Sequence, residues 1–503
     1  MASARLQSQT IGLSLIVLDK GSPESLRRQV YLRLRDAILS GQLRTGFRLP
    51  STRAVASALG VSRNTVADVF AQLVAEGYLA PRRGSGTYVA TVVPGPARSQ
   101  ERDPQTSWER ASTRGKLFST MLQSRRSADA APIPFRPGMP ALDLFPFDVW
   151  SRIASKVLRR PAPELVGYGD PAGYRPLREA IAAHVRATKR ITCSVEQILV
   201  VGGSQQALDL ICRLALDPGD EVWVEDPASP ALRATYASGG ANVIPVRVDA
   251  EGLSVECGRA LAPRARLAHV TSAHQWPLGV TLSAERRAEL LAWADDADAW
   301  IVEDEYDGAF RFDGDALVPL VALDRSDRVL FTGSFSVTTF PALRVGYLIA
   351  PAKLIDAFVA VKSAADRQTS TLEQAILADF MYDGHYTAHL ARMQAVYTER
   401  QARVRRSLEE FSGIQAAAPR SGLHVLLPLD ERTDDARIAE RAAAEGVVAP
   451  ALSRYYAGDA ARKGLLLGFG LARPAATDAA VRQLARHLPR ARTLHRAARD
   501  LPG

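Results

Sequence analysis

Residues 50–89 read PSTRAVASALGVSRNTVADVFAQLVAEGYLAPRRGSGTYV, and this segment carries the local signals that predict the fold of the N-terminal part of the chain. Ser51 and Ser62 are each placed to cap a helix, because a serine hydroxyl accepts a hydrogen bond from the first helical turn. Gly60 lies between them and tolerates the left-handed backbone of a tight turn. The apolar spacing predicts two buried helix faces, Ala54, Val55, Ala58 and Leu59 on the first and Val66, Val69, Phe70 and Leu73 on the second.

The first turn of the second predicted helix carries polar side chains. The cap Ser62 is followed by Arg63, Asn64 and Thr65, which lie opposite the apolar stripe. A recognition helix enters the major groove with its N-terminal end, and Arg and Asn pair well with guanine and adenine. This segment is therefore predicted to read base edges in double-stranded DNA.

A basic hairpin follows the helix pair. Residues 81–88 read PRRGSGTY, in which the glycines permit a tight turn and Arg82 and Arg83 lie at its tip, placed to contact phosphates or the minor groove. Between residues 20 and 90 there are 11 Lys and Arg against 4 Asp and Glu, which is most of the +9 net charge of the whole chain. A local excess of this size indicates a polyanionic partner for this segment.

The sequence LPSTRAVASALGVSRNTVADVFAQLVAEGYL (residues 49–79) resembles the GntR-type winged helix-turn-helix domain, and the match extends from Ser25 to Val89. The resemblance implies that Arg53 contacts a phosphate or a base and that residues 63–65 probe the major groove. It also implies that the turn at Arg83 reaches the minor groove of a promoter operator.

The length of 503 residues exceeds what one core holds and predicts a multidomain protein. We expect a DNA-binding domain in residues 1–90, a flexible linker rich in Ser, Arg, Gln and Thr in 91–131, and a large domain in 132–503. The three cysteines lack disulfide or metal-ligand spacing, and no apolar run approaches ~20 residues. These features predict a cytoplasmic protein that holds no metal and enters no membrane.

From residue 132 onward, helical patterns alternate with short β-branched runs, which predicts a mostly parallel sheet covered on both faces. The predicted strands are Gln197–Val201, Glu221–Val224, Ala268–Thr271, Trp300–Glu303, Arg328–Thr332 and Val345–Ile349. We expect an α/β domain.

Four motifs follow one another along this domain: GYGDPAG at 167–173, VGGSQQA at 201–207, VEDEY at 302–306 and FTGSFSVTTFPALRVGY at 331–347. Together with HQWPLG at 274–279 they resemble the class I/II aminotransferases, which have the pyridoxal-phosphate-dependent fold type I. A GntR-type domain followed by such a domain is similar to the MocR family of regulators.

The resemblance implies a site for pyridoxal phosphate. Asp304 would bond the pyridine nitrogen and Tyr306 the ring oxygen. The phosphate would be held by Ser204, Gln205, Ser334 and Arg344. Tyr168 would reach the phosphate bound by a neighbouring subunit, which implies a homodimer.

Two positions depart from the family pattern. The Ser-Phe-Ser-Lys motif supplies the Schiff-base lysine, but this chain has Val337 there, and Ser229 stands where a tyrosine usually stacks on the cofactor ring. A valine can neither bind the cofactor covalently nor move a proton. We therefore expect a non-catalytic homologue that binds pyridoxal phosphate noncovalently or not at all.

Three interpretations remain. The chain is a transcription regulator whose large domain dimerises and senses a small-molecule effector, or a regulator whose large domain is purely structural. The alternative is an enzyme, a pyridoxal-phosphate-dependent aminotransferase with an accessory DNA-binding head. Val337 argues against that alternative.

Overall fold

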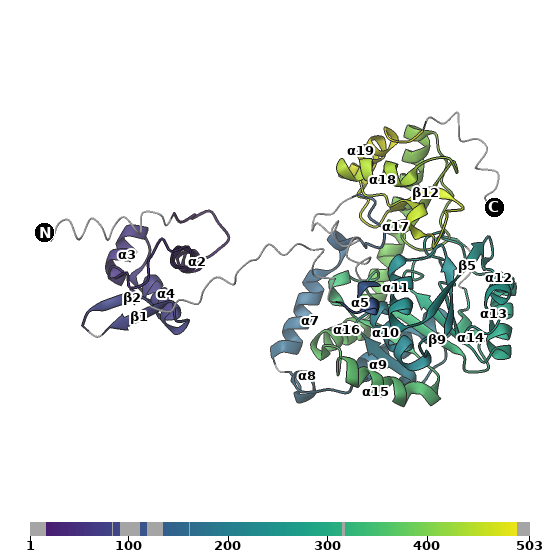
Figure 1. The fold of residues 1–503 in the computed structure, drawn as a ribbon, viewed down its shortest axis with the longest axis horizontal. Coiled ribbons are helices and arrows are strands. Elements are labelled where there is room, and N and C mark those ends of the chain that lie inside the picture. Colours follow the sequence, from purple (N-terminus) through teal and green to yellow (C-terminus); the bar gives the residue numbers. More distant parts are fainter. Residues whose placement is uncertain are drawn as a thin grey trace. The chain divides into compact units, whose positions relative to one another are not determined.

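A computed structural model describes residues 17–82, 84–90, 111–117, 134–159, 161–313 and 317–489. The chain separates into two compact units, Met1–Glu109 and Arg110–Gly503, and the boundary falls inside the range predicted as a linker. No helix among these described residues is long and apolar enough to cross a membrane. Each unit is described by itself (Figure 1).

The described residues of the first unit form three helices and a hairpin, as the sequence predicts. These are α2 (Leu26–Leu39), α3 (Thr52–Leu59), α4 (Arg63–Ala75), β1 (Leu79–Arg82) and β2 (Gly86–Val89). The stripe predicted on α4 is confirmed, because Val66, Val69, Phe70 and Leu73 all lie in the core of this unit. A single apolar cluster therefore holds α2, α3, α4 and the hairpin together.

The turn between α3 and α4 has the predicted chemistry. The Ser51 hydroxyl accepts from the backbone N–H of Ala54 at 3.3 Å, and Gly60 ends α3 with a left-handed φ of 64°. The predicted inner face of α3 was wrong in part, since Val55 and Ala56 are buried whereas Ala54 and Ala58 are exposed. Only one narrow side of α3 is buried. The elements that pack against α3 set which side this is.

The second unit is built on an eight-stranded sheet with the order β3-β10-β9-β8-β7-β4-β5-β6. Strands β9, β8, β7, β4 and β5 run parallel, while β10 is antiparallel to both of its neighbours and β6 is antiparallel to β5. The bounds are β3 (Ile198–Val201), β4 (Glu221–Asp226), β5 (Asn242–Asp249), β6 (Gly252–Leu253), β7 (Leu267–Val270), β8 (Trp300–Glu305), β9 (Val329–Ser334) and β10 (Gly346–Ile349).

The six predicted strands are all present, with ends that differ by no more than a few residues. Strands β5 and β6 were not predicted. Alternate residues of β3 enter different apolar clusters, Ile198 and Val200 on one side and Leu199 and Val201 on the other. The sheet is therefore buried on both faces, which explains why its strands are continuous β-branched runs.

Helices surround this sheet (Figure 1). They are α7 (Phe147–Arg159), α8 (Pro163–Val166), α9 (Arg175–Lys189), α10 (Ser204–Ala215), α11 (Pro230–Gly239), α12 (Val255–Leu261), α13 (Ala284–Asp296), α14 (Leu320–Leu323), α15 (Ile355–Ala365) and α16 (Thr371–Tyr382), with short 3-10 turns η1 (Leu142–Leu144), η2 (Val195–Gln197), η3 (Pro341–Leu343) and η4 (Ala352–Leu354).

The C-terminal part of the second unit forms its own layer around a separate apolar cluster. It contains α17 (His385–Ser412), β11 (His424–Leu429), α18 (Asp435–Ala444), η5 (Leu452–Tyr455), β12 (Lys463–Gly468) and α19 (Pro474–Ala485). Strands β11 and β12 pair antiparallel, and the sequence did not reveal them. This layer lies beside the sheet, at the yellow end of the chain in Figure 1.

Part of the range predicted as a flexible linker is helical. Helix α5 (Thr113–Leu117) packs against α11, and Arg114 Nε donates to the Ser238 carbonyl at 2.7 Å. Residues 91–110 and 118–131 of that range lie outside the described residues. A short segment of the range thus belongs to the second unit.

Candidate functional site

The first turn of α4 presents its polar side chains to solvent. Arg63 and Asn64 are exposed, and Thr65 is half-buried. The Ser62 hydroxyl accepts from the Thr65 backbone N–H at 3.0 Å and lies 2.8 Å from the Thr65 hydroxyl. The cap therefore fixes the backbone of this turn and leaves the Arg63 and Asn64 side chains available for a nucleic acid. Arg53, on α3, is exposed as well.

The hairpin adds basic groups that are held by a tyrosine. The guanidinium of Arg82 lies over the Tyr88 ring at 4.7 Å from its centroid, and Gly84 and Gly86 have positive φ angles of 70° and 109°. Arg83 lies outside the described residues. Sequence reasoning missed Arg48, whose chain segment pairs with β2 at Tyr88.

Gly86 explains how Arg48 fits beside the hairpin. A Cβ atom at Gly86 would lie 3.2 Å from Arg48 Nε, so the guanidinium rests directly on the glycine backbone. The missed residue had no sequence signal, because it becomes part of the basic surface only through a long-range strand contact.

In the second unit, the loop from β3 to α10 forms a cradle for an anion. Gly203 has a φ of 106°, and a Cβ atom there would lie 3.2 Å from Arg344 Nη2. Arg344 has a left-handed φ of 53°, which directs the chain after η3 back toward this loop. The N–H groups at the very start of an α-helix have no partner within the helix, and Ser204 and Gln205 begin α10. A guanidinium beside such a helix N-terminus suits a phosphate group.

The other residues predicted to hold the phosphate are Ser204, Ser334 and Gln205, and their side chains make different contacts. Ser204 is the first residue of α10 and is half-buried, and Ser334 ends β9 with its hydroxyl accepting from Ser336 N at 3.2 Å. The Gln205 side chain is exposed and donates to the hydroxyl of Thr235 on α11. The Gln205 amide is thus held away from the cradle, while Ser204 and Arg344 border it.

Asp304 lies near the end of β8, where the strand enters the predicted site. Its Oδ1 accepts from the Thr332 hydroxyl at 2.7 Å. Burial raises the pKa of Asp304 to about 6, although hydrogen bonds from Thr332 and Ser204 oppose that rise. The ionised form of this half-buried carboxylate would be stabilised by a protonated ring nitrogen, because an opposite charge favours ionisation.

Tyr306 is held by the buried His274, the first residue of the HQWPLG motif. Its hydroxyl donates to the His274 carbonyl at 3.1 Å and lies 3.1 Å from His274 Nδ1. That nitrogen is also 3.1 Å from Asp307 Oδ1, and the His424 ring packs 4.7 Å from the His274 ring. Burial, followed by the proximity of His274, lowers the pKa of His424 to about 4, so that this imidazole is neutral at pH 7. The cluster connects β11 to the segments that follow the inner strands β7 and β8.

An aromatic group covers the same region. Trp276 packs edge-on against Tyr306 at 5.7 Å, against His424 at 4.8 Å and against Tyr455 at 5.7 Å. Ser229, which stands where the family pattern has a tyrosine, precedes α11 and makes no capping hydrogen bond. The ring that borders the site in this chain is therefore Trp276.

Val337 follows β9 and lies in the apolar cluster of the C-terminal layer with 7% of its surface exposed. Its neighbour Thr338 accepts a hydrogen bond from Tyr386 at 3.0 Å. A branched apolar side chain suits this position, since its cluster consists of apolar and aromatic residues and burying an unpaired charge is costly.

Tyr168 is separated from these residues. It is 83% exposed, and the guanidinium of Arg367 covers one face at 4.3 Å from the ring centroid. Phe147, Val166 and Tyr382 are also exposed large apolar side chains, on α7, α8 and α16.

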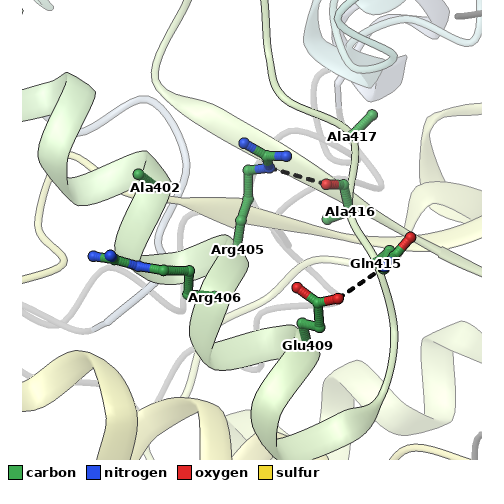
Figure 2. A pocket seen from close by; sticks show the side chains of 7 residues that line it. All are labelled: Ala402, Arg405, Arg406, Glu409, Gln415, Ala416 and Ala417. Carbon is green, nitrogen blue, oxygen red and sulfur yellow. Dashed lines mark hydrogen bonds between the residues drawn. The ribbon is translucent and has the colours of Figure 1, made fainter.

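A surface pocket of about 460 Å³ lies elsewhere, between α17 and residues 415–417 (Figure 2). Arg405 Nε donates to the Ala416 carbonyl at 3.0 Å, and Gln415 donates to Glu409 at 2.8 Å. Arg406 points to the other side of the helix in this view. None of the predicted site residues lines this pocket.

Residues 26–89 match the family "Bacterial regulatory proteins, gntR family", and residues 144–466 match "Aminotransferase class I and II". The chain is 37% identical over 459 residues to the probable rhizopine catabolism regulatory protein MocR of Rhizobium meliloti, covering 90% of this chain and 92% of that protein. It is 30% identical over 458 residues to the HTH-type pyridoxine biosynthesis transcriptional regulator PdxR of Corynebacterium glutamicum, with 90% and 94% covered.

Among solved structures, the multiple substrate aminotransferase of Thermococcus profundus matches with a TM-score of 0.68 and 29% identity, over 75% of this chain and 96% of that one. These likenesses confirm the predicted fold class, a winged helix followed by an aminotransferase-like domain of fold type I. The chain therefore belongs to the MocR family, in which a gntR-type DNA-binding domain is joined to an aminotransferase class I and II domain.

Proposed function

We propose that this chain is a transcription regulator whose N-terminal domain, residues 1–90, binds operator DNA and whose domain from residue 132 onward binds a small-molecule effector without catalysis. The observation that carries the DNA-binding part is the capped first turn of α4, which holds Arg63 and Asn64 exposed beside a basic hairpin. Such a turn can pair with base edges, while Arg82 contacts the backbone.

The residues of the large domain fit part of a pyridoxal phosphate molecule. The Gly203 backbone and the Arg344 guanidinium would hold the phosphate, and Asp304 would face the ring nitrogen. When bound, this cofactor supplies an electron-withdrawing ring. Tyr306 would bond the ring oxygen, and His274 orients its hydroxyl.

The same residues do not supply covalent attachment. Val337 has no amine, and its side chain packs in the C-terminal apolar cluster. Without that amine there is also no positioned base at this place for a proton transfer, a contribution worth roughly 10²- to 10⁴-fold in rate. The large domain therefore serves as a receptor, and pyridoxal phosphate or a related phosphate ester is its effector.

The regulator acts as a homodimer. Tyr168 is 83% exposed, and the family resemblance assigns it to the phosphate site of a second subunit. A dimer also presents two recognition helices to two half-sites. Sedimentation velocity at micromolar concentration tests this part, and a monomer that persists at all concentrations would contradict it.

The experiment that tests the whole proposal combines two measurements. Sequencing of the DNA bound in the native genome identifies the operator, and Arg63→Ala should reduce its selective recovery. Absorbance spectra of the protein with added pyridoxal phosphate, before and after borohydride reduction, followed by peptide mapping, test the absence of covalent attachment. A reduced cofactor adduct on any lysine, together with transaminase activity, would favour the aminotransferase alternative.

A further inference from the structure

A buried lysine anchors a hydrogen-bonded chain that ends at the phosphate cradle. Lys362 on α15 is fully buried, and its Nζ lies 2.9 Å from Asp366 Oδ1. Gln206 Nε2 donates to the other Asp366 oxygen at 2.5 Å, and Gln206 Oε1 accepts from the Gly202 N–H at 2.6 Å. Burial lowers the pKa of Lys362, and the hydrogen bond to Asp366 opposes this. A buried ammonium needs its partner, so Asp366 is held in place.

The two residues after Asp366 contact a different loop. Arg367 has a left-handed φ of 67° and places its guanidinium over the Tyr168 ring. Gln368 Oε1 accepts from the Gly169 N–H at 2.5 Å, and its amide donates to the Gly167 carbonyl at 3.4 Å. A non-glycine residue stays in the left-handed region only where its surroundings determine it. Three consecutive residues thus bind two loops that are far apart in the sequence.

We propose that Asp366–Gln368 is a positioning element that sets the loop Gly202–Ser204 and the loop Gly167–Gly169 for a phosphate ester ligand. This rests on the proposed function, in which the first loop holds the phosphate within the subunit and Tyr168 serves the partner's site. One element fixes both loops because its first residue hydrogen-bonds Gln206 and its last residue hydrogen-bonds Gly169. A ligand bound in one subunit is thereby tied to the surface that faces the other.

Backbone amide exchange of the full-length protein without ligand tests the positioning directly. Gln206→Leu removes the link to Gly202 and should accelerate exchange in residues 202–204 by roughly 3- to 10-fold, as expected for one lost hydrogen bond. Gln368→Leu should do the same in residues 167–169. Asp209→Asn is the matched control, because it removes an exposed ion pair with Arg213 on the same helix as Gln206 and should change neither loop.

The double variant Lys362→Met with Asp366→Asn tests whether one element serves both loops. It exchanges the buried ion pair for an apolar and a neutral group and should accelerate exchange in both loops. If this variant does not fold, the two single glutamine variants still decide the matter through ligand binding. Each should weaken binding of pyridoxal phosphate by roughly 3- to 10-fold and leave binding of pyridoxal, which lacks the phosphate, unchanged.

The outcomes separate this inference from the proposed function. Exchange that is unchanged in both loops, or pyridoxal phosphate affinity that is unchanged in both glutamine variants, would overturn the positioning element. If exchange responds as expected but the parent protein binds neither pyridoxal phosphate nor inorganic phosphate, the positioning element stands and the proposed effector is wrong.

Discussion

Replacing Glu225 by glutamine should make the large domain more stable at neutral and alkaline pH. Glu225 lies on β4 with 3% of its surface exposed, and its Oε2 accepts from the Thr271 hydroxyl at 2.6 Å and from the Thr271 N–H at 3.2 Å. Burial raises the pKa of this carboxyl from 4.5 to about 7, and the bonds from Thr271 only partly oppose the rise. Glutamine has the same shape, keeps an acceptor oxygen for Thr271 and carries no charge.

The direction follows from proton binding. Between pH 4.5 and about 7 the folded state holds a proton on Glu225 that the unfolded chain has lost, so the contribution of this carboxyl to stability falls as pH rises. The cost reaches about 3 kcal/mol above that window, from the shift of the pKa. We expect Glu225→Gln and the parent to have similar stability near pH 4.5, and the variant to gain steadily toward pH 8.

The assay is urea unfolding at several pH values, followed by tryptophan fluorescence. All six tryptophans lie outside residues 1–90, so the signal reports unfolding of the rest of the chain. Buried histidines give the opposite slope, because their folded pKa values are lowered and stability rises as pH passes upward through their window. These are His269, with a pKa of about 3, and His389 and His424, with pKa values of about 4; the half-buried His184, with a pKa of about 4, acts in the same direction.

Because the histidines are common to both proteins, the difference between Glu225→Gln and the parent isolates the carboxyl. Thr271→Val, which removes the hydroxyl that lowers the Glu225 pKa, should move the midpoint of the pH dependence upward. A difference between Glu225→Gln and the parent that is constant across this pH range would refute the reasoning.

Three further predictions concern the DNA-binding surface, a helix cap and the position of Val337. Arg63→Ala should cost about 1–3 kcal/mol of operator binding and relax specificity, whereas Arg82→Ala should weaken all sequences equally and flatten the salt dependence in anisotropy titrations. An unchanged operator affinity of Arg63→Ala would mean that α4 is not the recognition helix. Ser51→Ala, which removes the cap of α3, should destabilise that helix by about 1 kcal/mol in amide exchange, and equal protection would contradict the capping role. Val337→Lys should restore a yellow absorbance band with pyridoxal phosphate, which borohydride reduction should convert into a covalent cofactor adduct that dialysis does not remove; no yellow band would show that more of the site than one residue has changed.

The winged helix was predictable from the sequence because its determinants are local. Ser51, Gly60 and Ser62 act within one or two turns of their own position, and the α4 stripe repeats with the helical period. The central strands were predictable for a related reason, since a strand buried on both faces must be apolar throughout its length. Local patterns do not set the rotation of α3, and its buried face was therefore partly mispredicted.

The site depended on tertiary structure. His274, Asp307 and His424 lie on separate segments, yet a ring nitrogen of each histidine and a carboxylate oxygen of Asp307 come within 4.8 Å of one another. Motif resemblance could point to Asp304, Tyr306 and His274, but not to Asp307 and His424, because none of the quoted motifs contains those two residues. Strands β11 and β12 were not predicted, because no spacing pattern in the sequence indicated them. From the amino-acid sequence we could predict which segments form the helices and strands of the two domains. The sequence also shows which residues of the family pattern are replaced, as at Val337. Only the tertiary structure decided which distant side chains meet, because long-range contacts follow from the packing of the whole domain and not from any local period.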